Sequence, residues 1–141
     1  MGKSPGSALF EACFPASAPG LADALHGIDA VCRAHAFPAD LVSRVRIVVE
    51  ELFTNTIKYG YCGDSEKPVR LALSVAKGLM TLIFEDEAPA FDPTRYEIPA
   101  HRNPEHGPEG RSGIAMVMGL SKSAMYVRLA GGNRLTLTLK S

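Results

Sequence analysis

The segment "FPADLVSRVRIVVEELFTNTIKYGY" (residues 37–61) predicts the strongest helix of the chain and decides how the rest can fold. Its apolar side chains recur at helical steps of four, three and four residues, at Leu41, Val45, Val48 and Leu52. Three residues later the same stripe reaches Asn55. A buried amide costs free energy unless its hydrogen bonds are made, so such a position usually carries Leu or Ala. The partner of the Asn55 side chain is therefore the central question of this sequence.

Upstream of this helix, the sequence predicts one strand and one further helix. Residues 8–15 alternate weakly and stop at a proline, which is typical of a short edge strand. Residues 17–35 begin with a capping serine and an early proline, and apolar residues then recur at helical spacing. The helix of residues 37–61 is expected to end near Gly60.

Downstream, two hairpins enclose a long irregular stretch. Residues 68–76 and 79–86 predict two strands joined by a tight turn at Lys77 and Gly78. Residues 112–122 predict a short helix, and a second hairpin follows with its turn at residues 131–133. Hairpins next to each other imply antiparallel pairing with the helices on one face. The expected fold is a two-layer α/β (α+β) sandwich with a mixed, mostly antiparallel sheet.

Composition limits the possible functions. The 141 residues suit a single domain spanning 1–141, and 15 acidic side chains balance 15 basic ones. This balance gives no electrostatic case for direct binding of nucleic acid or of an anionic membrane. No apolar run approaches the roughly 20 residues of a membrane span, and we expect residues 1–7 to be disordered. Cysteines 13, 32 and 62 match neither a disulfide framework nor a zinc site, which favours free thiols in the cytoplasm.

Glu51 and Asn55 are the first candidates for chemistry. Residues four apart on a helix are neighbours on one side, so this carboxylate and this amide can point into the same space. Oxygen ligands of this kind suit a hydrated magnesium ion, and a carboxylate near the metal could act as a general base. The structural alternative is that Asn55 caps a neighbouring loop while Glu51 is solvated. The residues alone leave both possibilities open.

Two further segments could hold parts of a ligand. Asp86 ends an apolar strand, where a carboxylate could accept a hydrogen bond from the exocyclic amine of adenine; alternatively, it only stabilises its own turn. In "EGRSGIAMVM" (109–118), glycines precede a helix N-terminus, whose free N–H groups favour an anion such as phosphate, and Arg111 adds a cation. An ordinary glycine-flanked helix start would look the same. The P-loop sequence is absent.

The irregular stretch of residues 87–113 is rich in Pro, Gly, charge and histidine. A loop longer than about 15 residues in a compact domain is usually a lid, a binding loop or disordered. His101 and His106 lie in it beside Glu105, five residues apart. Without a third ligand, they are expected to be solvated and not to bind a metal.

In this order, the motifs resemble the Bergerat-fold ATPases, and among them the stand-alone anti-sigma-factor serine kinases. "EELFTNTIKYGY" (50–61) resembles the N box of that family, "EDEAPAFDP" (85–93) the G1 box, and "EGRSGIAMVM" the G2 box. The resemblance covers about residues 15–140. It implies a histidine-kinase-like ATPase domain with a nucleotide lid at about residues 93–111.

The resemblance also implies residue roles. Asn55 would ligate Mg²⁺ on the phosphates of ATP, Glu51 would be the catalytic base, and Asp86 would bind the adenine amine. The nucleotide-binding positions implied by the three boxes are Asn55, Tyr59, Asp86, Ala88, Phe91, Arg111, Ser112, Gly113, Ile114 and Ala115. The implied function is an ATP-dependent serine kinase that acts as an anti-sigma factor. Its implied partners are a sigma factor, an anti-anti-sigma (STAS-type) protein that it phosphorylates on serine, and a second copy in a homodimer.

Two positions depart from the family pattern. Ala88 stands where the G1 box usually has glycine, and Ala115 stands where the G2 box often has one. A methyl group at either position could narrow the cleft or restrict the backbone. These departures favour an alternative, in which the chain is a non-catalytic protein-binding switch module with weak or absent nucleotide binding.

Overall fold

The computed structural model describes residues 8–96 and 112–140. Its five strands are β1 (Ala8–Pro15), β2 (Pro68–Ala76), β3 (Leu79–Asp86), β4 (Ser121–Leu129) and β5 (Gly132–Leu139). They form one sheet in the order β1-β2-β3-β5-β4, with β1 at one edge as predicted. Every neighbouring pair of these strands is antiparallel, in agreement with the predicted predominance of antiparallel pairing, and no pair of the described strands is parallel. The connection from β1 to β2 contains two helices, which bring the chain back to the end where β1 finished.

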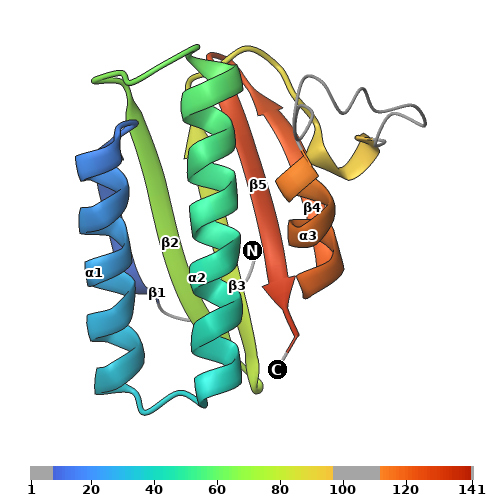
Figure 1. Ribbon diagram of the computed structural model, residues 1–141. Helices are drawn as coiled ribbons and strands as arrows, with labels where there is room; N and C mark the ends of the chain where they lie inside the picture. Colours follow the sequence, from blue (N-terminus) through green and yellow to red (C-terminus); the bar gives the residue numbers. More distant parts are fainter. Residues whose placement is uncertain (1–7, 97–111, 141) are drawn as a thin grey trace, which may run out of the picture.

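Three α-helices lie on one face of the sheet (Figure 1). They are α1 (Ala18–Ala34), α2 (Ala39–Asn55) and α3 (Ser112–Leu120). The Ser17 side chain accepts a hydrogen bond from the Gly20 N–H at 3.2 Å, so the predicted capping serine is confirmed. The two-layer α+β fold expected from the sequence is confirmed as well.

The core lies between the helices and the inner face of the sheet. Alternate residues of β3 and β5 are buried there, as the pleat of a strand requires. The apolar stripe of α2 packs onto them, because its four predicted positions are all buried. The largest fully buried side chains are Phe53, Ile28, Leu71, Leu73, Met80, Leu82, Ile114, Leu137, Leu139, Val45, Val48 and Val49.

Three element boundaries differ from the sequence prediction. The α-helical part of α2 ends at Asn55, and a π-helical turn over Thr56–Gly60 completes the predicted helix. Helix α3 ends at Leu120, because the chain enters β4 directly at Ser121. Asn133 lies within β5 and not in the preceding turn. The predicted turn at Lys77 and Gly78 is confirmed, since both residues have positive φ.

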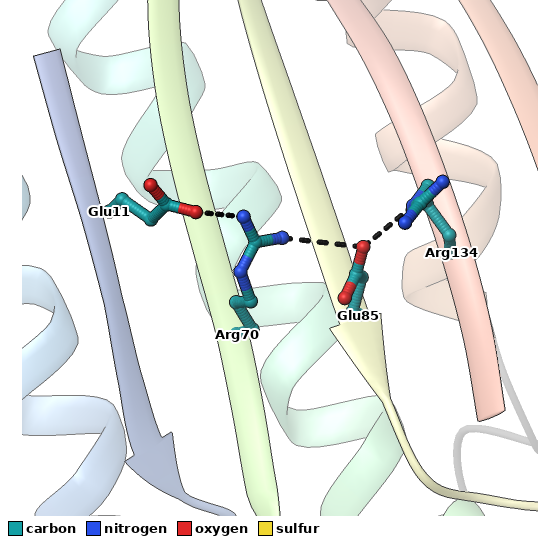
Figure 2. Close-up of polar contacts among 4 residues, drawn as sticks. All are labelled: Glu11, Arg70, Glu85 and Arg134. Carbon is teal, nitrogen blue, oxygen red and sulfur yellow. Dashed lines mark hydrogen bonds and ion pairs between the residues drawn. The ribbon is translucent and has the colours of Figure 1, made fainter. Parts of the chain in front are cut away.

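The opposite face of the sheet carries a row of charged side chains. Figure 2 shows Glu11, Arg70, Glu85 and Arg134 side by side on β1, β2, β3 and β5. Arg70 is paired with Glu11, and it lies 3.3 Å from a Glu85 oxygen that Arg134 also approaches at 2.6 Å. The hydrogen bond that Arg70 donates to the Glu11 carboxylate raises the pKa of Arg70 above its ordinary value. We call this row the charge ladder.

The remaining sequence expectations concern thiols and membranes. All three cysteines are free, with Cys32 buried and the other two exposed. In the part of the chain that the structure describes, no helix is long and apolar enough to cross a membrane. The expected disorder of residues 1–7, the loop histidines and most of the expected lid lie outside the described residues.

Candidate functional site

The end of α2 brings Asn55 to a cavity at one end of the sheet. Asn55 is the last α-helical residue, and its side-chain oxygen Oδ1 is buried. Among the described residues this oxygen has no hydrogen-bond partner. A buried acceptor without a partner costs about 1–3 kcal/mol, so it usually marks a place where a ligand, ion or water belongs. Within residues 8–96 and 112–140, no hydrogen bond supports the alternative in which this oxygen caps a neighbouring loop.

The π-helical turn that follows presents Thr56 to the same cavity. A π-turn inside a helix changes which side chains face a given direction and is frequent at functional sites. Thr56 is only 2% exposed, and its hydroxyl donates a hydrogen bond to Asp86 Oδ2 at 2.9 Å. The turn thereby connects α2 to the end of β3.

Asp86 lies at the carboxyl end of β3 and is held by three donors. Its Oδ2 accepts from the Thr56 hydroxyl, and its Oδ1 accepts from the Asn133 amide at 2.8 Å and from the Ala88 N–H at 3.2 Å. The bond from the Ala88 N–H is a local contact within the turn, as expected if Asp86 stabilised its own turn. The other two bonds come from distant elements, so Asp86 does more than stabilise its own turn.

The segment after Asp86 forms one wall of the cavity. Tyr61 accepts a hydrogen bond at its hydroxyl from the Glu87 N–H at 2.7 Å, which connects this segment to the residues that follow α2. Burial raises the pKa of the Tyr61 hydroxyl above its ordinary value, although the Glu87 hydrogen bond works in the opposite direction. Ala88 is buried, and Phe91 packs edge-to-face against Tyr96.

The cavity has a volume of about 70 Å³ and is mostly apolar, with a few convergent polar groups. Its lining residues are Leu52, Asn55, Thr56, Tyr59, Gly60, Phe84, Asp86, Ala88, Pro89, Ala90, Phe91, Pro93, Tyr126, Asn133 and Leu135. Apolar walls with a small number of placed polar groups are typical of small-molecule sites.

Helix α3 begins beside Glu51. A Cβ atom placed on Gly113 would lie 2.0 Å from a carboxylate oxygen of Glu51, so this carboxylate lies directly against the first turn of α3. Glu51 itself is half-buried, one turn before Asn55 on α2. The carboxylate thus lies at the helix N-terminus, where unpaired N–H groups favour negative charge.

The structure brings some predicted site residues together and separates others. Asn55, Tyr59, Asp86, Ala88 and Phe91 all line the cavity. Glu51 and Gly113 lie together but are not among the lining residues.

The other G2-box residues have different surroundings. Ile114 has its side chain in the hydrophobic core, and Ala115 is exposed. Ser112 is the first residue of α3, and Arg111 lies outside the described residues.

Sequence reasoning missed Thr56 and Asn133 as site residues. Asn133 was expected in a turn, but its side chain is buried in the cavity wall. The signal was present, because Asn133 extends the alternation of Leu135, Leu137 and Leu139 by one more inward position. Asn133 thus ends the inward apolar pattern of a strand in the same way that Asn55 ends the apolar stripe of α2.

Comparison with known proteins identifies the family. The profile of the histidine kinase-like ATPase domain matches residues 14–139, which is most of the chain. A sequence search of curated proteins found no match.

Among solved structures, the fold is similar to the crystal structure of the RsbU and RsbW domains of Rv1364c from Mycobacterium tuberculosis, with a TM-score of 0.65 and 17% sequence identity. The match covers 93% of this chain and 32% of that one, so the present chain spans about a third of the larger protein. At this identity the likeness concerns the fold. Because the family profile covers nearly the whole chain, the chain belongs to the histidine kinase-like ATPase domain family.

Proposed function

We propose that this chain is an ATP-dependent serine protein kinase that acts as an anti-sigma factor. The observation that carries the proposal is the convergence of Asp86 and Asn55 on one cavity, with Glu51 and the start of α3 beside it. These residues come from α2, β3 and α3, and they match the order of the three sequence boxes. Membership of an ATPase domain family supports ATP as the ligand.

The purine would bind where Asp86 faces the cavity. The carboxylate would accept a hydrogen bond from the adenine amine, and Tyr59 and Phe91 supply aromatic surface nearby. The cavity of about 70 Å³ is much smaller than a typical small-molecule pocket of roughly 300 Å³ or more. The ribose and phosphates would therefore extend beyond it, toward the N-terminus of α3.

Phosphates at the start of α3 would meet its free backbone N–H groups. Arg111, Ser112, Gly113, Ile114 and Ala115 are the residues that we assign to this contact. The inward side chain of Ile114 anchors the helix in the core, which leaves its backbone for the ligand. Ala115 has its methyl group exposed, so this departure from glycine does not fill the core.

Asn55 fits a magnesium ion bound on the phosphates. Its buried Oδ1 is an oxygen donor without a partner in the described structure. Within the same residues, no group of three or more His, Cys, Asp or Glu side chains could hold a metal alone. Mg²⁺ is commonly held by one or two protein oxygens together with substrate phosphates, and when bound it neutralises charge on the transferred phosphoryl group.

We assign Glu51 as the general base. In the proposed reaction, a partner serine oxygen forms a bond to the γ-phosphorus while the bond from that phosphorus to the β–γ bridging oxygen breaks. ADP leaves with the electron pair of the broken bond, and the serine proton passes to the Glu51 carboxylate. Glu51 lies one turn before Asn55 on α2 and against Gly113 of α3, and this position supports the role.

The partners that we assign are a sigma factor and an anti-anti-sigma protein of the STAS type. In this scheme the kinase holds the sigma factor and phosphorylates the anti-anti-sigma protein on serine. It releases the sigma factor when the anti-anti-sigma protein is unphosphorylated. These assignments rest on the sequence boxes together with the family.

We also assign a homodimer, formed through the sheet face that carries the charge ladder. No helix of the described structure covers this face (Figure 1), and it exposes Met125 (65%) and Val127 (42%), which pair with Thr136 and Arg134 of β5. The four ladder charges alternate in sign, negative, positive, negative, positive (Figure 2). A two-fold axis parallel to the strands would reverse that order, so each charge of one copy would face its opposite in the other.

A Glu51→Gln variant tests the kinase proposal against the non-catalytic switch. Glutamine keeps the size of the side chain but cannot accept the serine proton. We expect the variant to bind Mg-ATP as the parent does and to lose at least about a hundredfold in phosphoryl transfer to an anti-anti-sigma protein, measured with labelled ATP. Transfer at the parental rate would contradict the assignment of the base. Absence of both binding and transfer in the parent would favour the switch module.

A further inference from the structure

The Asn133 side chain forms hydrogen bonds in the cavity wall through both its nitrogen and its oxygen. Its amide nitrogen donates to Asp86 Oδ1 at 2.8 Å and to the carbonyl oxygens of Ala88 and Pro89, both at 3.1 Å. The residue is only 9% exposed, so these contacts are shielded from water. Asn133 therefore holds both the carboxylate and the backbone of the segment that follows it.

The acceptor side of Asn133 determines which way the amide points. Its Oδ1 accepts from the Phe91 N–H at 3.3 Å, from Arg128 at 3.3 Å and from the Tyr126 hydroxyl. A nitrogen at that position would face three donors, so the amide can take only the orientation that directs its NH₂ group toward Asp86. Donors from β4 and from the cavity wall thus fix the orientation of the Asn133 amide, which is the partner of Asp86.

Asp86 is consequently held from two sides. Thr56 donates to Oδ2 from the turn after α2, and Asn133 donates to Oδ1 from β5. A carboxylate held by donors on both oxygens cannot rotate freely, and it can offer only acceptor positions to the cavity. Such a group favours a ligand edge with an amine. It disfavours an edge with a carbonyl oxygen at the same place, because two acceptors would then face each other.

We propose that Asn133 is a positioning residue that sets the base selectivity of the nucleotide site. A carboxylate only accepts hydrogen bonds, and Asn133 holds that of Asp86 in one orientation. In this way Asn133 favours a purine with an exocyclic amine over one with a carbonyl group. The inference rests on the proposed ATP site and adds to it a residue that acts through Asp86. The β4–β5 hairpin then becomes part of base recognition, although it lies outside the three boxes.

The test compares affinities for ATP, GTP and inorganic tripolyphosphate, each with Mg²⁺, by calorimetry. We expect the parent to bind ATP more tightly than GTP. In the Asn133→Ala variant, the ratio of ATP affinity to GTP affinity should be about tenfold lower than in the parent. Its affinity for tripolyphosphate should stay within about twofold of the parental value, since the phosphates lie away from Asp86. If Asn133 only supported the structure of the site, the variant would bind ATP, GTP and tripolyphosphate more weakly by a similar factor.

Two further variants keep the test decisive. Asn133→Asp retains an acceptor for Phe91, Tyr126 and Arg128 but replaces the donor with a second carboxylate, so the loss of ATP preference should be at least as large. Arg46→Met is the control, because it removes the 2.5 Å ion pair with Asp29 in the helical layer, and Arg46 belongs neither to the cavity lining nor to the charge ladder. It should leave the ATP-to-GTP ratio unchanged.

The outcomes separate this inference from the proposed function. A parent that discriminates ATP from GTP together with Asn133 variants that discriminate equally well would overturn the role of Asn133 and leave the nucleotide site intact. A parent that binds tripolyphosphate but neither nucleotide would refute the base site, and the selectivity inference with it.

Discussion

Ala88 and Gly60 share one small volume in the cavity wall: a Cβ atom placed on Gly60 would lie 2.8 Å from the Cβ of Ala88. Ala88 is 3% exposed, and both residues line the cavity. The methyl group that departs from the family pattern is accommodated because the residue facing it has no side chain. The departure at position 88 therefore leaves the packing intact.

The first prediction concerns this pair. Gly60→Ala should lower the free energy of unfolding by about 1–3 kcal/mol, because the two methyl groups would overlap. Adding Ala88→Gly should restore most of the loss, since it vacates the shared volume. Urea denaturation of the two single variants and the double variant measures the coupling. Additive effects would show that the two side chains do not compete for space.

The second prediction tests the adenine contact. Asp86→Asn should reduce the rise in melting temperature that Mg-ATP produces, because the amide replaces one fixed acceptor with a donor. The same change should lower the free energy of unfolding by about 1–3 kcal/mol, through mismatched donors at Thr56 or Asn133. Thermal unfolding with and without Mg-ATP measures both effects.

Glu85→Gln is the control for that experiment. It neutralises the adjacent carboxylate, which points to the opposite face of the sheet. Its ligand-induced shift should equal that of the parent. If Mg-ATP raised the melting temperature of Asp86→Asn as much as that of the parent, Asp86 would not be the adenine contact.

The third prediction follows from the unpaired oxygen of Asn55. Asn55→Leu should raise the free energy of unfolding of the ligand-free protein by about 1 kcal/mol, because a buried acceptor without a partner is replaced by an apolar group. The variant should also lose the dependence of ATP binding on Mg²⁺. Asn55→Asp, which keeps an oxygen ligand, should retain that dependence. If the leucine variant binds ATP with undiminished Mg²⁺ dependence, Asn55 is not the ligand.

The fourth prediction concerns the open sheet face. Met125→Glu should convert the proposed dimer to a monomer, because a charge would replace an apolar side chain that the partner buries. Sedimentation velocity measures the change. Met116→Glu is the matched control, since Met116 is 50% exposed on α3, in the helical layer. A parent that is monomeric at all concentrations would refute the interface.

The fifth prediction concerns the thiols. Cys13 and Cys62 are exposed and should react quickly with a thiol reagent in the native protein. Cys32 should react only on unfolding, because it is 2% exposed. Burial, and then the nearby Asp29, raises the pKa of Cys32 above its ordinary value of 9.0. A raised pKa means that its contribution to stability is complete below about pH 9 and is lost as the pH rises through the folded-state pKa.

Cys32→Ala provides the comparison for that pH dependence. The parent should lose more stability than this variant between about pH 9 and pH 11, measured by urea denaturation. Parallel stability curves would show that the thiol does not contribute to the alkaline loss.

Local patterns were sufficient for most of the fold. Both strands of the first hairpin have the predicted bounds, because the alternation and the Lys77–Gly78 turn are properties of neighbouring residues. The predicted helices also form, and Ser17 caps the first of them. The boundaries that differed, at Asn55 and Leu120, depend on how the helix ends pack against other elements.

The candidate site was only partly predictable. Asn55 and Asp86 could be singled out because each places a polar group at the end of an apolar pattern. The partners of Asp86 could not, since Thr56 and Asn133 are 30 and 47 residues away along the chain. The sequence also could not predict that Gly60 leaves room for the Ala88 methyl group, because this depends on the distance between two backbone segments.

The sequence by itself thus determined the layers, the sheet and the polar side chains that interrupt the apolar stripes, because periodicity and turn chemistry act between near neighbours. Only the tertiary structure decided which of those polar groups meet. Hydrogen bonds between α2, β3 and β5 require a particular register of the strands and a particular end of the helix, and no local pattern specifies the two together.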